Sequence, residues 1–194
     1  MLCDPTQRER INSFALVSYV PNPLAAFLDQ LRQELVPTCF LRAHISILPP
    51  RTLLVPPNEA WRHICEVAPL FSPFDVHLTD VRAFPGSNVI YLAVAEDIDR
   101  ISEMHAVLNT DGLESVEAFD FVPHVTLAQD LGPADVDLVA DLARKRWAEF
   151  PHPRSFRLET ITFVQNTEGN NWIDLGEYRL GTGHVHLLEP MARR

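Results

Sequence analysis

Hydrophobic and polar positions in the first half of the chain follow two periods, which predict alternating strands and helices. Residues 12–20 are apolar and rich in β-branched and aromatic side chains, and they end at a proline-rich break, as a strand does. Apolar residues spaced three and four apart over 24–35 predict a helix, because that spacing places them on one face. Three segments complete this half: a strand over 43–48 closed by Pro49 and Pro50, a helix capped by Asn58 and running to about Phe71, and a strand over 74–84.

The second half repeats this order of elements. After a turn at 85–87, the pattern predicts a strand over 89–95, a helix over 98–108, a strand over 119–128, a helix over 135–150 and a strand over 156–165. A hairpin turn at 167–170 then leads into a last strand from Trp172 to Leu180. The residues beyond Gly181 show no interpretable period, and we expect a loose tail there.

Matching residues in the two halves stand at a common distance along the sequence. Three pairs are each separated by 80 residues: His44 and His124, Leu78 and Leu158, and Val81 and Ile161. A shared offset across separate elements indicates an internal duplication. We therefore expect a single bilobal domain over residues 1–194, with repeats at about 12–84 and 87–166 and a C-terminal strand at 171–180. The expected fold class is α+β, with two pseudo-symmetric lobes whose sheets line a central cleft and whose helices lie outside.

Composition narrows the choice of ligand. The chain has 194 residues, 46% of them hydrophobic, which is enough for a substantial core in one domain. Its formal net charge of −10 argues against an extended basic surface for long nucleic acid. An anionic ligand should therefore be small, or be bound by a local cluster of polar groups. Nothing in the sequence indicates an oligomer, and a monomer is the default expectation.

The cysteines and the apolar runs predict a cytoplasmic protein without a membrane segment. Cys3, Cys39 and Cys65 are odd in number and form no C-x-x-C pair, so reduced thiols are expected. The polar N-terminus has no apolar signal-peptide core. The longest strongly apolar run, at 89–95, is too short to cross a bilayer.

Two short segments combine a histidine with a hydroxyl group two residues later. They read His44-Ile45-Ser46-Ile47 and His124-Val125-Thr126-Leu127. Side chains on a strand alternate between its faces, so each histidine shares a face with its hydroxyl while the aliphatic residues point the other way. One such segment is a weak signal, but two copies at equivalent places in a repeat indicate a functional pair.

Two imidazoles on opposite sides of one phosphorus centre can divide proton transfer between them. Histidine titrates near neutral pH, so one ring can accept a proton from water while the other donates one to the leaving oxygen. The hydroxyls of Ser46 and Thr126 can hold non-bridging phosphate oxygens. The scheme makes His44 and His124 the catalytic residues and needs neither metal ion nor cofactor. The motifs are nearly symmetric and do not themselves assign which histidine is the base.

Other residues near the motifs are weaker candidates. Arg42 and Arg82, like Arg51, could contact a phosphate, with a solvated surface role as the alternative. Four aromatic residues could stack on a base or else belong to the core: Phe84, Tyr91, Phe121 and Trp172. His184-x-His186 has the spacing of two metal ligands, but no third ligand is near it in the sequence, and we predict no metal site.

The paired H-x-[ST]-x segments resemble those of the 2H phosphoesterase superfamily, in particular its 2′-5′ RNA ligase or RNA 2′,3′-cyclic phosphodiesterase (LigT-like) branch. The resemblance covers about Phe14 to Leu180 and includes the segment from Arg82 to Pro85. It implies two pseudo-symmetric α+β lobes around a cleft. It also implies cleavage or formation of 2′-linked phosphodiesters without metal or cofactor. Ser46 stands where the family more usually has threonine, and the hydroxyl is retained.

For this chain, the resemblance implies a phosphodiesterase that hydrolyses 2′,3′-cyclic phosphates, on a small nucleotide or an RNA end, to 2′-phosphates. It also implies His124 as the base acting on water and His44 as the acid on the leaving oxygen. Three alternatives stay open. They are a 2′-5′ RNA ligase-like activity, a non-catalytic nucleotide-binding module of the same fold, and an unrelated α+β protein whose histidines are incidental.

Overall fold

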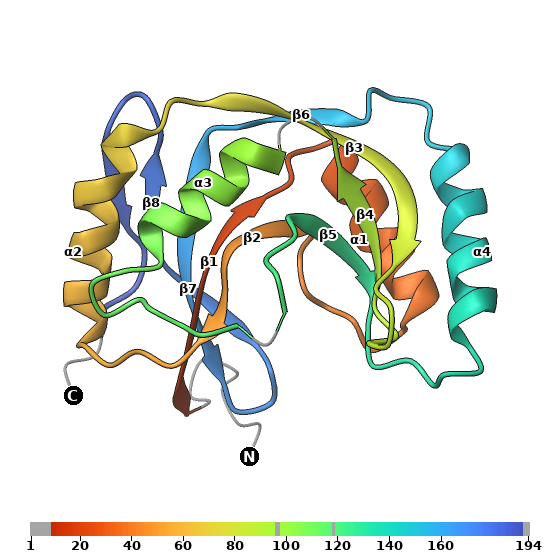
Figure 1. The fold of residues 1–194 in the computed structure, drawn as a ribbon, viewed down its shortest axis with the longest axis horizontal. Coiled ribbons are helices and arrows are strands. Elements are labelled where there is room, and N and C mark those ends of the chain that lie inside the picture. The colour runs from red at the N-terminus through yellow and green to blue at the C-terminus, as the bar shows by residue number, and fades with distance from the viewer. Residues whose placement is uncertain (1–8, 96–97, 118, 192–194) are drawn as a thin grey trace, which may run out of the picture.

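Two antiparallel β-sheets flanked by helices make up the computed structural model, which describes residues 9–95, 98–117 and 119–191 (Figure 1). This is the α+β architecture expected from the sequence. The elements follow in the order β1 (Arg10–Tyr19), α1 (Leu24–Leu35), β2 (His44–Arg51), α2 (Pro57–Val67), the 3₁₀ helix η2 (Ala68–Leu70), β3 (Phe74–Ala83), β4 (Ile90–Val94), α3 (Ile98–Leu108), β5 (His124–Ala128), α4 (Val136–Ala148), β6 (Ser155–Leu158), β7 (Thr160–Thr167), β8 (Trp172–Arg179) and β9 (His184–Leu187).

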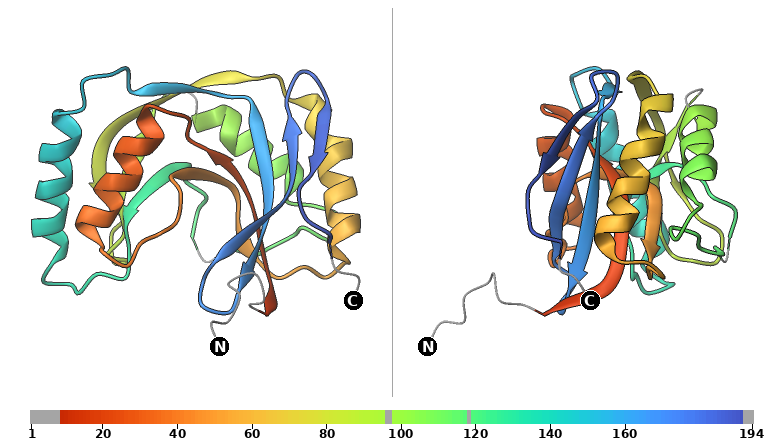
Figure 2. Two further views of the ribbon diagram at one scale, coloured as in Figure 1. Left: turned by 180° about the vertical axis from the view of Figure 1, so that it is seen from behind. Right: turned by 90° about the vertical axis from the view of Figure 1, so that its left-hand side faces the viewer.

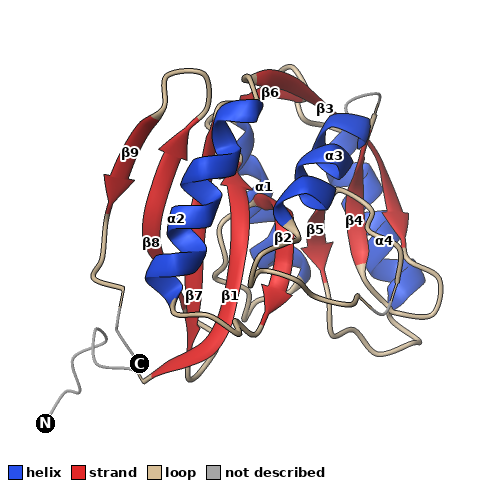
Figure 3. Ribbon diagram, turned by 60° about the vertical axis from the view of Figure 1, so that its left-hand side comes forward, coloured by secondary structure: helices blue, strands red, loops and turns tan. Residues whose placement is uncertain are grey.

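The strands that carry the paired histidines form one edge of each sheet. The larger sheet has the order β2-β1-β7-β8-β9, and the smaller sheet has the order β5-β4-β3-β6. Strands β2 and β5 contact each other, so the two sheets meet along these edges. Helix α3 packs against β2, while α1 and α4 pack against β5 and β3 (Figures 1 and 3).

Helices cover one face of the larger sheet, and His44 lies on the other face. On the covered face, Trp61 of α2 stacks on Phe163 of β7, with ring centroids 6.1 Å apart. Seen from behind, the other face of β1, β7 and β8 is turned toward the viewer, with α2 and α3 behind the sheet (Figure 2). Pairing of Val17 with Ser46 places the first motif's polar residues on this second face. A small apolar cluster around Ala15, Val17 and Val164 lies there, separate from the main core.

The third strand of each repeat joins the sheet started by the other repeat. β3, from the first half, pairs with β4, and β7, from the second half, pairs with β1. Where these crossing segments pass each other, β3 pairs with β6 through Val76 and Phe156. These two residues are 80 positions apart, as are His44 and His124. Equivalent residues that face each other lie on a pseudo-two-fold axis, so the register supports an internal duplication.

Residues 156–165 do not form the single strand that their apolar pattern predicts. β6 ends at Leu158 and pairs with β3, whereas β7 begins at Thr160 and pairs with β1 in the other sheet. β6 buries Phe156 and Leu158 and β7 is buried along most of its length, so apolar residues recur through both strands. The change of sheet at Glu159 leaves no mark in that pattern.

Prolines account for three other differences from the predicted boundaries. β2 continues through Pro49 and Pro50, which an edge strand tolerates because one side of its backbone needs no partner. The strand predicted over 119–128 begins only at His124, directly after a proline. Asn58 does not cap α2, because Pro57 occupies the first helical position and Asn58 follows it within the first turn.

The residues after Gly181 form a strand instead of the expected loose tail. Gly181 and Gly183 have positive φ angles of 76° and 67° in a tight turn, and β9 then pairs antiparallel with β8. Four residues are too few to reveal a period in the sequence. The rings of His184 and His186 have centroids 6.4 Å apart on this exposed edge strand.

The remaining expectations concern the cysteines and membrane-spanning segments. Cys39 and Cys65 are free thiols. No helix in the described ranges is long and apolar enough to span a membrane. Cys3 and the N-terminal segment through residue 8 lie outside the described residues.

Candidate active site

His44 and His124 are the first residues of β2 and β5, the strands along which the two sheets meet. Each histidine and the hydroxyl residue that follows it are half-buried on one face of their strand. The aliphatic residues on the other face are 0–1% exposed: Ile45, Ile47, Val125 and Leu127. Packing of these residues into the core fixes the direction of the polar pair on each strand.

Each imidazole is oriented by the same backbone contact. Nδ1 of His44 lies 2.7 Å from the carbonyl oxygen of Arg42, and Nδ1 of His124 lies 2.6 Å from that of Val122. A carbonyl oxygen can only accept, so Nδ1 carries the proton in both rings and donates it. In the neutral ring Nε2 then has a free lone pair, which is the form that a general base requires.

Loss of hydration lowers the pKa of both imidazoles below the ordinary value of 6.5. For His44 it is the main cause and brings the pKa to about 4, with the charges of Arg32, His124 and Arg42 acting in the same direction. The pKa of His124 is lowered by loss of hydration as well. Both rings are therefore mainly neutral at pH 7 in the unliganded protein. The influence of His124 on His44 agrees with the contact between β2 and β5.

Two aromatic side chains surround His124. Phe84 stacks on Tyr91 with ring centroids 4.0 Å apart. Both rings meet His124 edge-on, at 5.0 Å from Phe84 and 5.3 Å from Tyr91. Phe84, predicted as a possible substrate contact, therefore lies beside one of the histidines.

A polar group of three residues, Tyr19, Arg42 and Asp174, lies beside His44. Tyr19 is directly opposite His44 in the β1–β2 register and meets the imidazole edge-on at 6.3 Å. Its hydroxyl donates to Oδ1 of Asp174 over 2.6 Å, and Arg42 Nη2 donates to the other carboxylate oxygen in an ion pair. The Arg42 guanidinium also lies 3.5 Å from the centroid of the Tyr19 ring. We refer to these three residues as the Arg42 group.

Charge and burial keep the Tyr19 hydroxyl protonated. Loss of hydration, and then the hydrogen bond and the charge of Asp174, raise the pKa of Tyr19 above its ordinary value of 10. Tyr19 therefore acts as a donor to Asp174, whose carboxylate holds Tyr19 and Arg42 together.

The hydroxyl groups of Ser46 and Thr126 lie one pleat farther along the two strands. Ser46 is opposite Val17, and Thr126 is opposite Tyr91. The described part of the chain supplies neither hydroxyl with a hydrogen-bond partner. Both donors are therefore available to a ligand on the histidine face of each strand.

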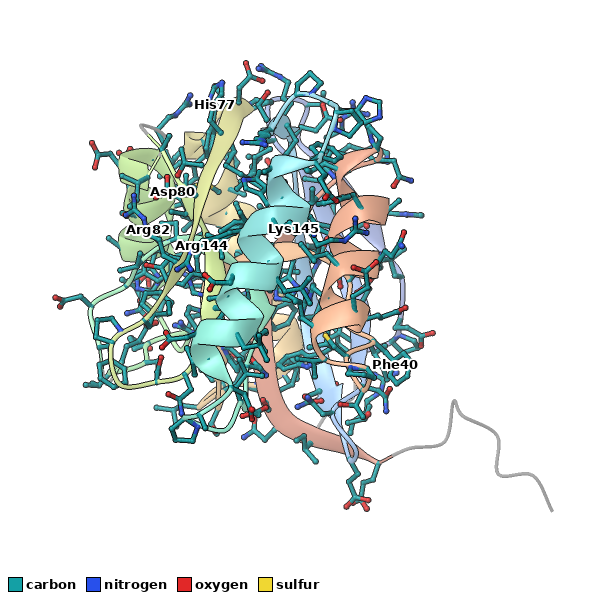
Figure 4. The ribbon with its side chains drawn as sticks, turned by 90° about the vertical axis from the view of Figure 1, so that its right-hand side faces the viewer. Phe40, His77, Asp80, Arg82, Arg144 and Lys145 are labelled. Atoms are coloured by element: carbon teal, nitrogen blue, oxygen red, sulfur yellow. The ribbon has the colours of Figure 1, made fainter. Side chains whose placement is uncertain are left out.

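Arg82 and Trp172, two further predicted contacts, hydrogen-bond to residues outside the two motifs. Arg82 is opposite Tyr91 in the register, but its side chain is 57% exposed and its Nε donates to Asp80 over 2.8 Å. Figure 4 shows Asp80 and Arg82 together along β3. Trp172 packs on the small apolar cluster of the larger sheet and donates from Nε1 to Asn170 over 3.1 Å.

Two of the weaker candidates have structural roles. The Arg51 side chain is 1% exposed, donates to the Leu113 carbonyl over 2.7 Å and pairs with Glu117 at 3.1 Å. It therefore ties β2 to the loop that follows α3 and is not a solvated surface residue. Phe121 stacks on His105 with centroids 3.8 Å apart, and His105 Nδ1 contacts the Ile47 carbonyl at 2.8 Å.

Sequence reasoning missed Tyr19 and Asp174. Tyr19 ends a strand that reads as apolar, and Asp174 lies in a strand after the last repeat. The only signal for Tyr19 is its place at the end of the strand that precedes the first motif, and it becomes informative only when the register is known. Asp174 is 132 residues from Arg42, and no spacing in the sequence joins them.

One cavity of about 390 Å³ adjoins the Arg42 group. It is lined by residues that include Ser18, Tyr19 and Thr160. A second cavity, of about 460 Å³, lies between α2 and residues 187–191, and neither histidine lines it. Within the described ranges, no cluster of three or more His, Cys, Asp or Glu side chains is arranged to hold a metal ion.

Comparison with known protein families gives one match. A model of the 2′-5′ RNA ligase superfamily matches residues 20–170, a range that contains both motifs. A provisionally named phosphoesterase of Halalkalibacterium halodurans is 22% identical over 178 residues, which cover 87% of this chain and 98% of the relative. Another from Bacillus cereus is 28% identical over 153 residues, which cover 73% and 84%.

Solved structures with a similar fold include those of Escherichia coli LigT. Its complex with 3′-AMP has a TM-score of 0.59 and 15% identity, covering 89% of this chain and 99% of LigT. Its complex with ATP has a TM-score of 0.58 and 15% identity, covering 87% and 98%. At this level of identity, the likeness establishes a common fold.

Proposed function

Because the chain belongs to the 2′-5′ RNA ligase superfamily, we propose that it is a phosphoesterase that hydrolyses 2′,3′-cyclic phosphates to 2′-phosphates. The observation that carries this proposal is the pair of edge strands. β2 and β5 contact each other, and each begins with a histidine whose Nδ1 is held by a backbone carbonyl. A nucleotide ligand is further supported by the LigT complexes with 3′-AMP and ATP.

The proposed reaction uses one imidazole for each proton transfer. The base accepts a proton from water as the water oxygen bonds to phosphorus. The bond from phosphorus to the 3′ oxygen breaks, and that oxygen takes a proton from the acid. The product carries a 2′-phosphate, and the two histidines have exchanged protonation states. Ser46 and Thr126 donate hydrogen bonds to the non-bridging oxygens, where negative charge gathers.

We assign the base to His124 and the acid to His44, following the family resemblance. Arg32 and Arg42 disfavour the protonated form of His44 in the unliganded protein. The acid must therefore gain its proton as the substrate binds, because the negative phosphate stabilises a neighbouring imidazolium.

An aryl phosphodiester with a p-nitrophenolate leaving group should distinguish the two roles. This leaving group departs without a proton, so the acid becomes dispensable while the base remains necessary. On this substrate, the factor by which His44→Ala lowers kcat/KM should be at least about tenfold smaller than on a cyclic phosphate. His124→Ala should lower kcat/KM by a similar factor on both substrates. Steady-state release of p-nitrophenolate measures both. If the loss of kcat/KM on the aryl substrate were smaller for His124→Ala alone, the assignment of base and acid would be reversed.

The pH dependence should follow the lowered pKa values. Turnover needs one neutral and one protonated imidazole, so kcat/KM, which reports the free protein, should be bell-shaped. The pKa values of His44 and His124 both lie below 6.5, so kcat/KM should be greatest below pH 6.5 and should decrease as the pH rises from its optimum. Bound phosphate raises both values and should move the kcat optimum to higher pH. An optimum of kcat/KM above pH 7 would contradict this account.

The direct test is an assay of the purified, chelator-treated protein. Nucleoside 2′,3′-cyclic phosphates and an oligonucleotide with a cyclic end are offered, and phosphorus NMR identifies the product isomer. We expect 2′-phosphates and no effect of chelator. A 3′-phosphate product, or turnover that depends on added metal, would overturn the proposed reaction.

Ligation is the second candidate function, because the matched superfamily is described by that activity. Ligation would open the same cyclic phosphate with the 5′-hydroxyl of a second strand in place of water: the 5′ oxygen bonds to phosphorus, the bond from phosphorus to the 3′ oxygen breaks, and the 3′ oxygen takes the proton from the acid. Incubation of a cyclic-ended oligonucleotide with a 5′-hydroxyl oligonucleotide should then yield a 2′,5′-linked product that resists nucleases specific for 3′,5′ links. Failure to detect that product at high strand concentration would remove this candidate.

A further inference from the structure

The surroundings of the two histidines differ although the motifs match. Arg42 precedes His44 by two residues, whereas Val122 holds the equivalent place before His124. Opposite the histidines on the neighbouring strands stand Tyr19 in one sheet and Ala93 in the other. The duplicated site therefore has one cationic side and one apolar side.

The Arg42 side chain is not a buried structural tie. Arg51, which has that role, is 1% exposed, whereas the Arg42 side chain is 56% exposed beside His44. Asp174 takes one N–H donor of Arg42, and a guanidinium has five. The Tyr19 ring and the Asp174 carboxylate fix the plane of the guanidinium, which leaves a positioned cation with spare donors in a protein of net charge −10. Such a planar fork suits a phosphate.

An aromatic surface adjoins this cation. Trp172 and Asp174 are two residues apart on β8 and therefore face the same side of the sheet. Trp172 and Tyr19 both pack on the apolar cluster around Val17 and Val164. A phosphate donor next to a flat aromatic surface matches the two parts of a nucleotide, its phosphate and its base.

We propose that the Arg42 group and Trp172 form a subsite for the nucleotide that precedes the reacting end of an RNA. This inference rests on the proposed function, because it takes the cyclic phosphate to lie between the histidines. A 2′,3′-cyclic phosphate closes the 3′ end of a chain, so any further phosphate of the substrate lies on its 5′ side. The preferred substrate class is then an RNA 3′ end of two or more nucleotides, bound through a short local cluster.

The test compares three substrates that share one reacting group. They are a nucleoside 2′,3′-cyclic phosphate, the same compound with a 5′-phosphate, and a dinucleotide that ends in the cyclic phosphate. We expect kcat/KM to be at least about tenfold higher for the two substrates that carry the additional phosphate. Arg42→Ala should bring that ratio close to one, while leaving the backbone carbonyl that orients His44 in place.

Two further variants separate the causes. Arg42→Ala leaves Asp174 without its cation, which could repel the additional phosphate, so the double variant Arg42→Ala/Asp174→Asn removes both charges and should also give a ratio close to one. Arg144→Ala is the matched control, because that side chain is 52% exposed, pairs with Asp141 and lies on α4 (Figure 4). It should keep the wild-type ratio. Trp172→Ala should reduce the advantage of the dinucleotide alone.

The results that would overturn the subsite differ from those that would overturn the reaction. Equal kcat/KM for all three substrates in the wild-type protein, or an undiminished ratio in Arg42→Ala, would reject the subsite while hydrolysis stands. A gain for the 5′-phosphate compound with none for the dinucleotide would reject the RNA end as the substrate class. If no cyclic phosphate is hydrolysed, calorimetric binding of a nucleoside 2′-phosphate with and without a 5′-phosphate reads the subsite independently. Equal affinities there would reject it.

Discussion

Replacing His44 or His124 with alanine is expected to lower the turnover of a nucleoside 2′,3′-cyclic phosphate about 100- to 10,000-fold in each case. Each ring makes one proton transfer that water would otherwise have to make, and Nε2 is the atom that faces the ligand because Nδ1 is bonded to the backbone. The double variant should be little worse than the poorer single variant, because the two transfers belong to one reaction. Steady-state kinetics with product quantification measures all three.

The histidine variants need a control for folding and a control for chemistry. His44 and His124 are half-buried, and urea denaturation should show that each alanine variant remains folded under assay conditions. His152, which is exposed and contacts Phe150, provides the matched substitution outside the site, and His152→Ala should keep wild-type turnover. If the wild-type protein binds nucleotides but turns nothing over, and both alanine variants bind equally well, the protein is a binding module.

Loss of either hydroxyl should have the second largest effect. Ser46→Ala and Thr126→Val are each expected to lower kcat about 100- to 1,000-fold, which is the effect of removing one donor from an oxyanion site. The hydroxyls lie on the histidine faces of β2 and β5 without a partner among the described residues, so their removal should leave the fold intact. Because charge on the phosphate oxygens grows in the transition state, kcat should fall more than KM rises.

The conservative exchange provides the sharper readout for the hydroxyls. Ser46→Thr keeps the donor and restores the residue that the family more usually has, so its kcat should stay within a few-fold of wild type. Thr182→Val, in the turn before β9 where the hydroxyl donates to the Arg179 carbonyl, is a control outside the site. Ser46→Ala and Thr126→Val proteins with kcat close to wild type would show that the hydroxyls do not stabilise the transition state.

Short-range features of the site could be predicted from the sequence. Residues 44–46 and 124–126 each lie within one strand, so period-two alternation was enough to place each histidine and hydroxyl on one face. The shared offset of 80 residues was enough to pair the motifs, and the observed contact of β2 with β5 agrees with it. These inferences concern neighbours in the chain or equivalent positions in a repeat, both of which a sequence displays.

Features that depend on long-range pairing could not be predicted. Tyr19 lies beside His44 only because β1 and β2 pair in one register, and Asp174 on β8 reaches Arg42, just before the start of β2, across the two intervening strands β7 and β1. The change of sheet at Glu159 was hidden because Leu158 and Ile161 are buried in the same way in different sheets. β9 was missed because its place depends on β8 and on a turn of two glycines with positive φ.

The crossing of the third strands has a consequence for a single repeat taken alone. β3 pairs with β4 in the sheet that holds β4 and β5, and β7 pairs with β1 in the sheet that holds β1 and β2. In a single repeat, the first and third strands would therefore both lack the neighbouring strand with which they pair here. One repeat made as a separate chain would therefore be expected to need a second copy of itself, with each copy lending a strand to the other as in a domain-swapped homodimer. Two identical subunits would surround both imidazoles with identical residues, whereas the single chain can carry Arg42 two residues before His44 and Val122 two residues before His124.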